Sequence, residues 1–414
     1  MSCFFGILSL FIYTTWCKAE EEPTFENVKD PSTFYSSFED HCLPCDRIAN
    51  GCGKKQGWIF DFGGWAETGI YTNSHGWSTN GPMHTKGNER TDFHLDQLYF
   101  YGEAKYKTRN KIELGGRADF VYGVDAPGMQ CNGDDSFDSR WGANRHDYAA
   151  AIYQLYGTVA YRNLHVKIGK FLTPIGWEGS ASKDNFFYSH SYCYWIEPST
   201  HSGVLVNYSV NDRLTLSGGW TAGNNTSFEN HYDDNALLAG FTFNLTEKAT
   251  IYYWMTLGKT ENGYRKDQWR LAEGLARQDF FIQSLCFEWK PTDRFTYVMQ
   301  YNLRNDADVE AGTFQKVGRY SSYGINNHFL YSVNDRWHIG MRLEWLRDNG
   351  GFGYFVEEPA NYFQVTLGLN WTPNKHLSFR PEIRYDSVLN GSARPFGDGR
   401  RDQIAGGIGM LYIF

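Results

Sequence analysis

Hydrophobic and polar residues alternate along most of the chain from Trp58 onward. In the stretch 337–347, one set of alternate positions is apolar and begins at Trp337, whereas the intervening set contains Arg342 and Glu344. A period of two places successive side chains on opposite faces of a β-strand. The pattern therefore predicts a series of strands, each with one apolar face and one polar face.

The gaps between the predicted strands are alternately short and long. The short gaps hold turn residues, as at 210–212 and 333–335, whereas the long gaps include 127–147 and 307–319. This regular alternation of short and long gaps predicts an antiparallel up-and-down barrel with short periplasmic turns and longer extracellular loops. The chain has room for about sixteen strands, and bacterial barrels of this kind have an even number of strands.

The charged residues of the predicted strands fall on the same face as the glycines and hydroxyl-bearing residues. A charge on the lipid face costs about 2–4 kcal/mol near the middle of the membrane, so this face should line a wet interior. About sixteen strands leave an aqueous channel, whereas about eight are filled by side chains. We therefore expect residues 58–414 to form an all-β transmembrane β-barrel, integral to the bacterial outer membrane.

The last predicted strand supports this interpretation. Its alternate positions are apolar from Ile404 to Phe414, and a terminal aromatic residue resembles the assembly signal of outer-membrane barrels. From this strand alone, a soluble β-sandwich is the alternative. The two folds differ in where the apolar faces lie: toward lipid in a barrel, and between two sheets in a sandwich.

Composition narrows the choice of partners. The formal net charge is -8, which argues against a nucleic-acid partner. Aromatic residues make up 17% of the chain, and tyrosine and tryptophan are typical of membrane interfaces. The mean hydropathy is -0.53, and the part after the N-terminal segment has no run long enough for a membrane helix.

The N-terminal residues predict a segment that directs export. Residues 1–19 have an apolar core and end at Ala19, which is typical of a signal peptide. Residues 20–57 lack alternation, and we expect a periplasmic leader there. Export implies an oxidising compartment.

Five cysteines are candidates for disulfides. The leader cysteines form a redox pair, half a metal site or, as we favour, a structural disulfide, because no second pair or histidine completes a metal site. Two further cysteines fall in predicted outer loops and could bridge them. In order, the candidates are Cys42, Cys45, Cys52, Cys131 and Cys193.

The long gap at 179–201 is the third outer loop, and it holds more aromatic residues than a solvated loop requires. We hypothesise that it folds into the lumen and narrows the pore. The alternative is a loop that packs over the barrel mouth or against a neighbouring subunit. The candidate constriction residues are Glu178, Asp184, Asn185, Tyr188 and His190.

Several charged or titratable residues are expected to face the lumen from the strands. If Glu178 and Asp184 face wall arginines, they set a transverse field that sieves polar solutes. The alternative is that these charges solvate a wide lumen and pair with each other. The predicted wall residues are His165, Lys167, Arg342, Glu344, Arg380, Glu382 and Arg384.

Three motifs carry a family resemblance: KIGKFLTPIGWEG at 167–179, DNFFYSHSY at 184–192 and EPSTHSGVLVNYSV at 197–210. In these stretches the chain resembles the beta-barrel porin-2, OmpL-like family, and the resemblance covers about residues 57–414. It implies an outer-membrane porin. The family does not fix a substrate.

The favoured function is a passive diffusion channel for small hydrophilic solutes. A structural or adhesive barrel, whose loops bind partners, is the alternative. An outer-membrane hydrolase is disfavoured, because Asp184, Ser189 and His190 lack the spacing of a recognisable triad. We expect no enzyme activity, no cofactor and no metal site. The expected partners are outer-membrane lipid, small polar solutes and further copies of the chain, in a homotrimer.

Overall fold

A computed structural model describes most of the chain after the N-terminal segment. The predicted signal peptide at 1–19 and the leader with Cys42, Cys45 and Cys52 lie outside the described residues. The described ranges are 57–75, 93–107, 112–131, 137–139, 141–142, 148–228, 235–260, 278–311, 315–349 and 358–414.

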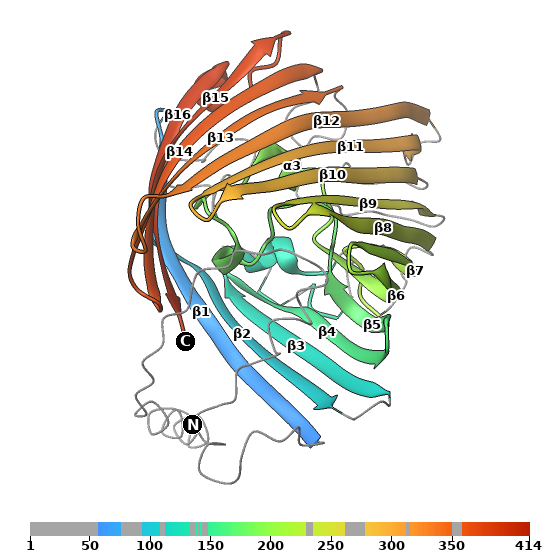
Figure 1. Cartoon of the computed structure of the whole chain (residues 1–414). Helices are drawn as coiled ribbons and strands as arrows, with labels where there is room; N and C mark the ends of the chain where they lie inside the picture. Colours follow the sequence, from blue (N-terminus) through green and yellow to red (C-terminus); the bar gives the residue numbers. More distant parts are fainter. Residues whose placement is uncertain are drawn as a thin grey trace. The chain divides into compact units, whose positions relative to one another are not determined.

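Sixteen antiparallel strands form one closed barrel within these ranges (Figure 1). Every strand pairs with its neighbours in sequence, and β1 closes the ring by pairing with β16. The predicted fold and strand number are therefore confirmed. The strands are β1 (Gly57–Asn73), β2 (Phe93–Lys107), β3 (Glu113–Gly123), β4 (Ala149–Tyr161), β5 (Leu164–Leu172), β6 (Thr200–Asn211), β7 (Leu214–Asn224), β8 (Asn235–Thr246), β9 (Ala249–Thr260), β10 (Gln278–Thr292), β11 (Phe295–Ala311), β12 (Gln315–Ser332), β13 (Trp337–Asp348), β14 (Ala360–Asn374), β15 (Leu377–Asn390) and β16 (Asp402–Ile413).

Tight turns join the strands at one end of the barrel. At 162–163, for example, two residues connect β4 to β5, and the same number connects β6 to β7 at 212–213. One long gap is shorter than predicted. The backbone of β11 and β12 continues into the range 307–319, and only residues 312–314 separate the two strands.

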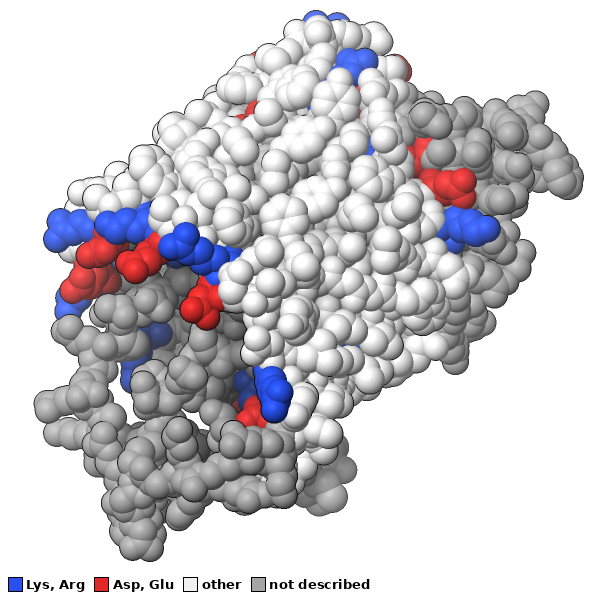
Figure 2. Space-filling view, turned by 45° about the vertical axis from the view of Figure 1, so that its right-hand side comes forward, with Lys and Arg blue, Asp and Glu red and all other residues white. Residues whose placement is uncertain are grey.

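The outward-facing side chains are apolar and exposed. Leu367 is 51% exposed and Ile408 is 43% exposed, although both belong to the alternating apolar sets. Figure 2 shows a broad surface without charged residues between two charged rims. A sandwich would bury these side chains between its sheets, so the exposed apolar band excludes that alternative. None of the helices in the described ranges is long and apolar enough to cross a lipid bilayer.

The buried hydrophobic residues lie inside the ring of strands. The described part of the chain has five clusters of them, and each cluster includes at least one side chain from the segment 173–199 between β5 and β6. A single connecting segment therefore supplies part of every internal core. The residues that it contributes are Ile175, Trp177, Ala181, Tyr188, Tyr192 and Ile196.

Candidate functional site

The segment 173–199, called L3 here, connects β5 to β6 and lies inside the ring of strands, where Figure 1 draws it in green. It contains a 3-10 turn, η3 (Ser182–Asp184), and a one-turn helix, α3 (Tyr192–Trp195). L3 begins with a sharp bend at Gly176, whose φ is +90°. A Cβ atom there would collide with the carboxylate of Glu197, so the bend requires glycine.

Three consecutive aromatic residues of L3 pack against glycines of the inner wall. Phe186 covers Gly340 on β13, and Phe187 covers Gly368 on β14, where a Cβ atom would lie 2.9 Å from the ring. Tyr188 continues the row, and a Cβ atom on either of two paired glycines of β1 and β16 would lie 2.5 Å from it. These paired glycines are Gly69 and Gly409.

Two wall glutamates accept hydrogen bonds from consecutive backbone N–H groups of L3. Glu382 on β15 accepts from the amides of Tyr188 (2.8 Å) and Ser189 (3.1 Å). Glu344 on β13 accepts from the amides of Tyr192 (2.7 Å) and Cys193 (2.6 Å). Each carboxylate thus satisfies two buried donors that no regular secondary structure would satisfy.

Wall arginines donate to the carbonyl groups of the same segment. Arg380 Nη1 donates to the carbonyl oxygens of Ser182 (2.7 Å) and Asn185 (2.9 Å). Arg384 Nη1 donates to the carbonyl oxygen of His190 at 2.6 Å. The alternating acids and arginines of β13 and β15 therefore bind the amides and carbonyls of L3 in turn.

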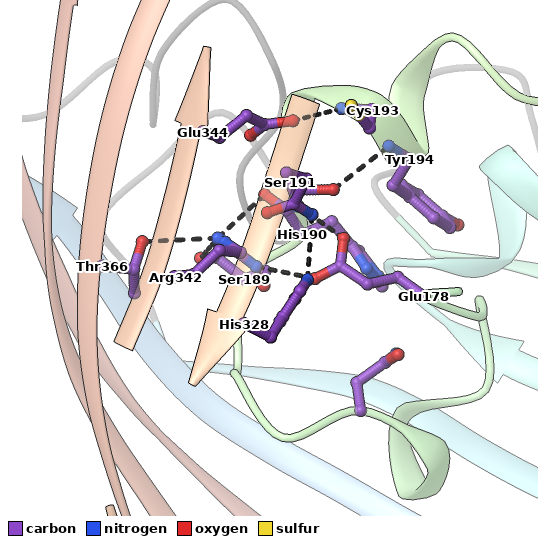
Figure 3. Close-up of polar contacts among 12 residues, drawn as sticks. Glu178, Ser189, His190, Ser191, Cys193, Tyr194, His328, Arg342, Glu344 and Thr366 are labelled. Carbon is purple, nitrogen blue, oxygen red and sulfur yellow. Dashed lines mark hydrogen bonds and ion pairs between the residues drawn. The ribbon is translucent and has the colours of Figure 1, made fainter. Parts of the chain in front are cut away.

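Arg342 and Glu178 form the central ion pair of this contact (Figure 3). Arg342 Nη1 lies 2.8 Å from Glu178 Oε1, and both side chains are almost fully buried. The same guanidinium donates to the carbonyl oxygen of Ser189, while Glu178 Oε2 accepts from the amide of Ser191 at 2.8 Å. Burial raises the pKa of Glu178, but Arg342 and two histidines outweigh that effect and lower the pKa to about 2.

L3 is also bound to strands β2, β10 and β11. Gln97 on β2 accepts from the amide of Ser182 (3.1 Å) and donates to the carbonyl oxygen of Ser180 (2.8 Å). Trp177 donates its backbone N–H to Gln300 at 3.1 Å and its ring N–H to Glu288 at 3.1 Å. The segment is thus attached to strands on opposite sides of the ring.

The structure brings most of the predicted residues together. Glu178, Asn185, Tyr188 and His190 contact the predicted wall charges Arg342, Arg380, Glu382 and Arg384, and Glu344 holds the amides of α3. Tyr188 also donates its hydroxyl to Asp96 on β2, at 2.8 Å.

Asp184 is placed differently: its Oδ1 lies 2.6 Å from Lys183 Nζ, and both side chains are about one-third exposed. The two predicted residues of β5 are separate from this contact. Lys167 Nζ lies 4.6 Å from the ring centre of Tyr156, on the adjacent strand, and His165 is two positions earlier on the same face.

The predicted disulfide between cysteines of two outer loops is wrong. Cys131 and Cys193 are both free and buried. The amide of Cys131 donates to Asp138 at 2.9 Å, whereas the amide of Cys193 donates to Glu344, so the two residues are fixed by different partners. Burial raises the pKa of both thiols, to about 11 for Cys131.

Sequence patterns did not predict the contacts that L3 makes with β1 and β2. Glu67 on β1 accepts a hydrogen bond from the hydroxyl of Ser182, and Gln97 on β2 accepts one from its amide. Both residues lie on polar faces of their strands, but nothing in their spacing along the sequence relates them to L3. The glycines under the aromatic residues left a weak signal, because Gly340 and Gly368 lie on the polar face of neighbouring strands and pair with each other. Among the described residues, no group of histidine, cysteine, aspartate and glutamate side chains is arranged to hold a metal ion.

The chain matches the family model described as beta-barrel porin-2, OmpL-like, over residues 60–414. No curated protein matches it significantly.

Solved porins share the fold at low sequence identity. OmpT of Vibrio cholerae, in its trimer form, is 13% identical, with a TM-score of 0.57 over 86% of this chain and 100% of that chain. An anion-selective porin from Comamonas acidovorans is 9% identical, with a TM-score of 0.56 over 86% of this chain and 100% of that chain. The outer-membrane channel DcaP of Acinetobacter baumannii is 12% identical, with a TM-score of 0.55 over 88% of this chain and 100% of that chain.

Proposed function

Because the chain belongs to the beta-barrel porin-2, OmpL-like family and is an integral outer-membrane β-barrel, we propose that it is a passive diffusion channel for small hydrophilic solutes. The family and the fold favour a channel over an enzyme. The solutes cross the membrane through the lumen of the barrel, and L3 sets the width of the passage.

The attachment of L3 to the inner wall supports this proposal. The segment is held by buried carboxylates and guanidinium groups on β13 and β15, and by Gln97 on β2 and Gln300 on β11. Hydrogen bonds to charged groups in a buried setting are stronger than those between neutral groups. L3 therefore acts as a fixed constriction with a defined cross-section. The wall charges position the segment, and Glu178 neutralises Arg342 instead of setting a transverse field.

Planar-bilayer recording with the purified protein tests the proposal. Wild-type protein should give steps of constant conductance in KCl, and deletion of residues 183–192 should raise the conductance of each step. Deletion removes most of η3, the aromatic row and the first residue of α3, so it widens the passage. If correctly assembled barrels carried no current, a structural or adhesive barrel would be favoured. If the deletion left the conductance unchanged, L3 would not be the segment that narrows the pore.

We further propose a homotrimer, because OmpT of Vibrio cholerae is solved in a trimer form and closed symmetry is the rule for soluble homo-oligomers. Chemical cross-linking in the native membrane, followed by mass measurement, should give a species of three chains. A cross-linked pattern that stops at a single chain would contradict the trimer and leave the channel proposal intact.

A further inference from the structure

Five consecutive tight turns at the periplasmic end of the barrel share one construction. A side-chain oxygen at the start of each turn accepts a hydrogen bond from the backbone N–H two residues further on. Asn334 Oδ1, for example, accepts from the amides of Arg336 (2.9 Å) and Trp337 (3.1 Å). This bond holds the backbone of the residues that follow. The corresponding residues of the other turns are Asn211, Thr246, Thr292 and Asn374.

Four of these turns, called the charged turns here, place an acidic residue directly before a basic one. They are successive along the ring, from the turn between β6 and β7 to the turn between β12 and β13. The fifth turn has Lys375 and His376 in the same two positions. All eight side chains of the charged turns are exposed. The pairs are Asp212–Arg213, Glu247–Lys248, Asp293–Arg294 and Asp335–Arg336.

The two charges of a charged turn do not pair with each other. Consecutive residues of opposite charge can form an ion pair, as Lys183 and Asp184 do in L3. Within the described ranges, the charged turns form no such pair, and Lys248 Nζ instead donates to the carbonyl oxygen of Pro291 at 3.0 Å. Each charged turn therefore presents a carboxylate and a cation side by side to the surroundings.

Aromatic side chains place the charged turns at the surface of the membrane. Trp337 follows Arg336 directly, is 40% exposed and stacks on Trp371, with 5.7 Å between the ring centres. Trp289 and Tyr331 are exposed on the outer face near the same end of the barrel. Tryptophan and tyrosine are enriched where lipid headgroups meet the hydrocarbon. A charged rim also borders the uncharged band in Figure 2. The charged turns therefore lie at the level of the headgroups of the periplasmic leaflet.

We propose that the charged turns bind phospholipids whose headgroup carries both a phosphate and a primary ammonium group, as phosphatidylethanolamine does. The arginine or lysine donates to the phosphate, and the ammonium group donates to the neighbouring carboxylate. The quaternary ammonium of phosphatidylcholine has no N–H to donate. Phosphatidylglycerol has no cation, so the carboxylate repels it. This inference depends on the outer-membrane barrel and is independent of the proposed channel function.

Native mass spectrometry of the full-length protein in detergent tests the proposal. Phosphatidylethanolamine, phosphatidylcholine and phosphatidylglycerol with identical acyl chains are added in turn, and the lipids that remain bound are counted. Wild-type protein should bind phosphatidylethanolamine about twofold to fivefold more tightly than either of the other lipids, because each exposed ion pair contributes little.

Two double variants separate the roles of the acidic and basic residues. Asp293→Asn with Asp335→Asn removes two carboxylates at nearly constant shape, so it should reduce the preference for phosphatidylethanolamine and increase the binding of phosphatidylglycerol. Arg294→Gln with Arg336→Gln should weaken the binding of all three lipids, because all three contain the phosphate that these residues bind.

Glu358→Gln with Asp398→Asn is the matched control, because it removes two exposed acids from the extracellular loops. Asparagine tolerates the positive φ of Asp398, which is +58°. The control should keep the wild-type lipid preference, and heat-modified gel mobility checks assembly of every variant.

Three outcomes would overturn the proposal. They are equal binding of the three lipids by the wild type, tightest binding of phosphatidylglycerol, and an unchanged preference after Asp293→Asn with Asp335→Asn. Each of these results would leave the channel proposal intact, because no current is measured.

Discussion

Phe186 of L3 lies directly over Gly340 of β13, where even the Cβ atom of an alanine would overlap its ring. Gly340 pairs with Gly368 of β14, which lies under Phe187. These two paired glycines, called the seat here, form a flat part of the wall against which two successive rings pack. The absence of side chains on the wall therefore determines how closely L3 approaches it, and the charged residues around the seat determine where along the wall it is held.

Gly340→Ala should destabilise the barrel and reduce its conductance. The added methyl group has to displace the ring of Phe186, and overpacking of this kind costs about 1–3 kcal/mol. Because the ring moves away from the wall and toward the lumen, the single-channel conductance in KCl should fall. Unfolding by urea in lipid vesicles measures the change in stability.

Gly218→Ala on β7 is the matched control for that substitution. A Cβ atom at Gly218 would meet nothing within 4 Å, so both stability and conductance should remain at the wild-type values. If Gly340→Ala behaved like Gly218→Ala in both measurements, the seat would not fix the position of L3.

The ion pair between Arg342 and Glu178 should dominate the attachment of L3. Removing one partner leaves the other charge buried and unpaired, which costs about 3–5 kcal/mol. Glu178→Gln and Arg342→Met should each lower the free energy of unfolding by that amount, and the double variant should lose less than the sum. A double-mutant cycle from urea unfolding measures this coupling.

Lys183→Gln is the comparison for the cycle, because Lys183 forms an ion pair with Asp184 that is about one-third exposed. Exposed pairs contribute about 0–1 kcal/mol, so this variant should unfold almost as the wild type does. Strict additivity of Glu178→Gln and Arg342→Met would show that the two side chains do not stabilise each other.

Cys131 and Cys193 should both be found as unbridged thiols. Burial raises the pKa of each thiol, so alkylation of the native protein should be slow. Denaturation without a reducing agent should make both react at once, and peptide mapping by mass spectrometry would locate the label. A peptide pair joined through these two residues would contradict this prediction.

Alternation in the sequence was sufficient to predict the barrel, because each strand meets lipid on one face and the interior on the other. In β13, the position of Arg342 on the polar face also predicted its inward direction. Its partner could not be predicted, since Glu178 is 164 residues away and their approach depends on the register of many strands and on the path of L3. The contact of Glu67 could not be predicted for the same reason. Ser182 of L3 donates a hydrogen bond to Glu67 from a distance of 115 residues along the chain.

The contribution of the Arg342–Glu178 pair to the attachment of L3 should persist in mild acid and be lost only near pH 2. Burial raises the pKa of Glu178, but Arg342, His328 and His190 outweigh burial and lower the pKa from 4.5 to about 2. A carboxylate whose pKa is lowered by folding stabilises the folded state fully above its ordinary pKa, and this contribution is lost as the pH falls from 4.5 to about 2. Single-channel conductance, recorded from pH 6 downward, should therefore show a rise below about pH 3 that comes from Glu178, as Arg342 loses its partner and L3 separates from the wall. Glu178→Gln has no carboxylate to titrate, so the part of the rise that Glu178 causes should be absent from this variant. An equal rise in wild type and Glu178→Gln would assign the acid response to other carboxylates of the lumen.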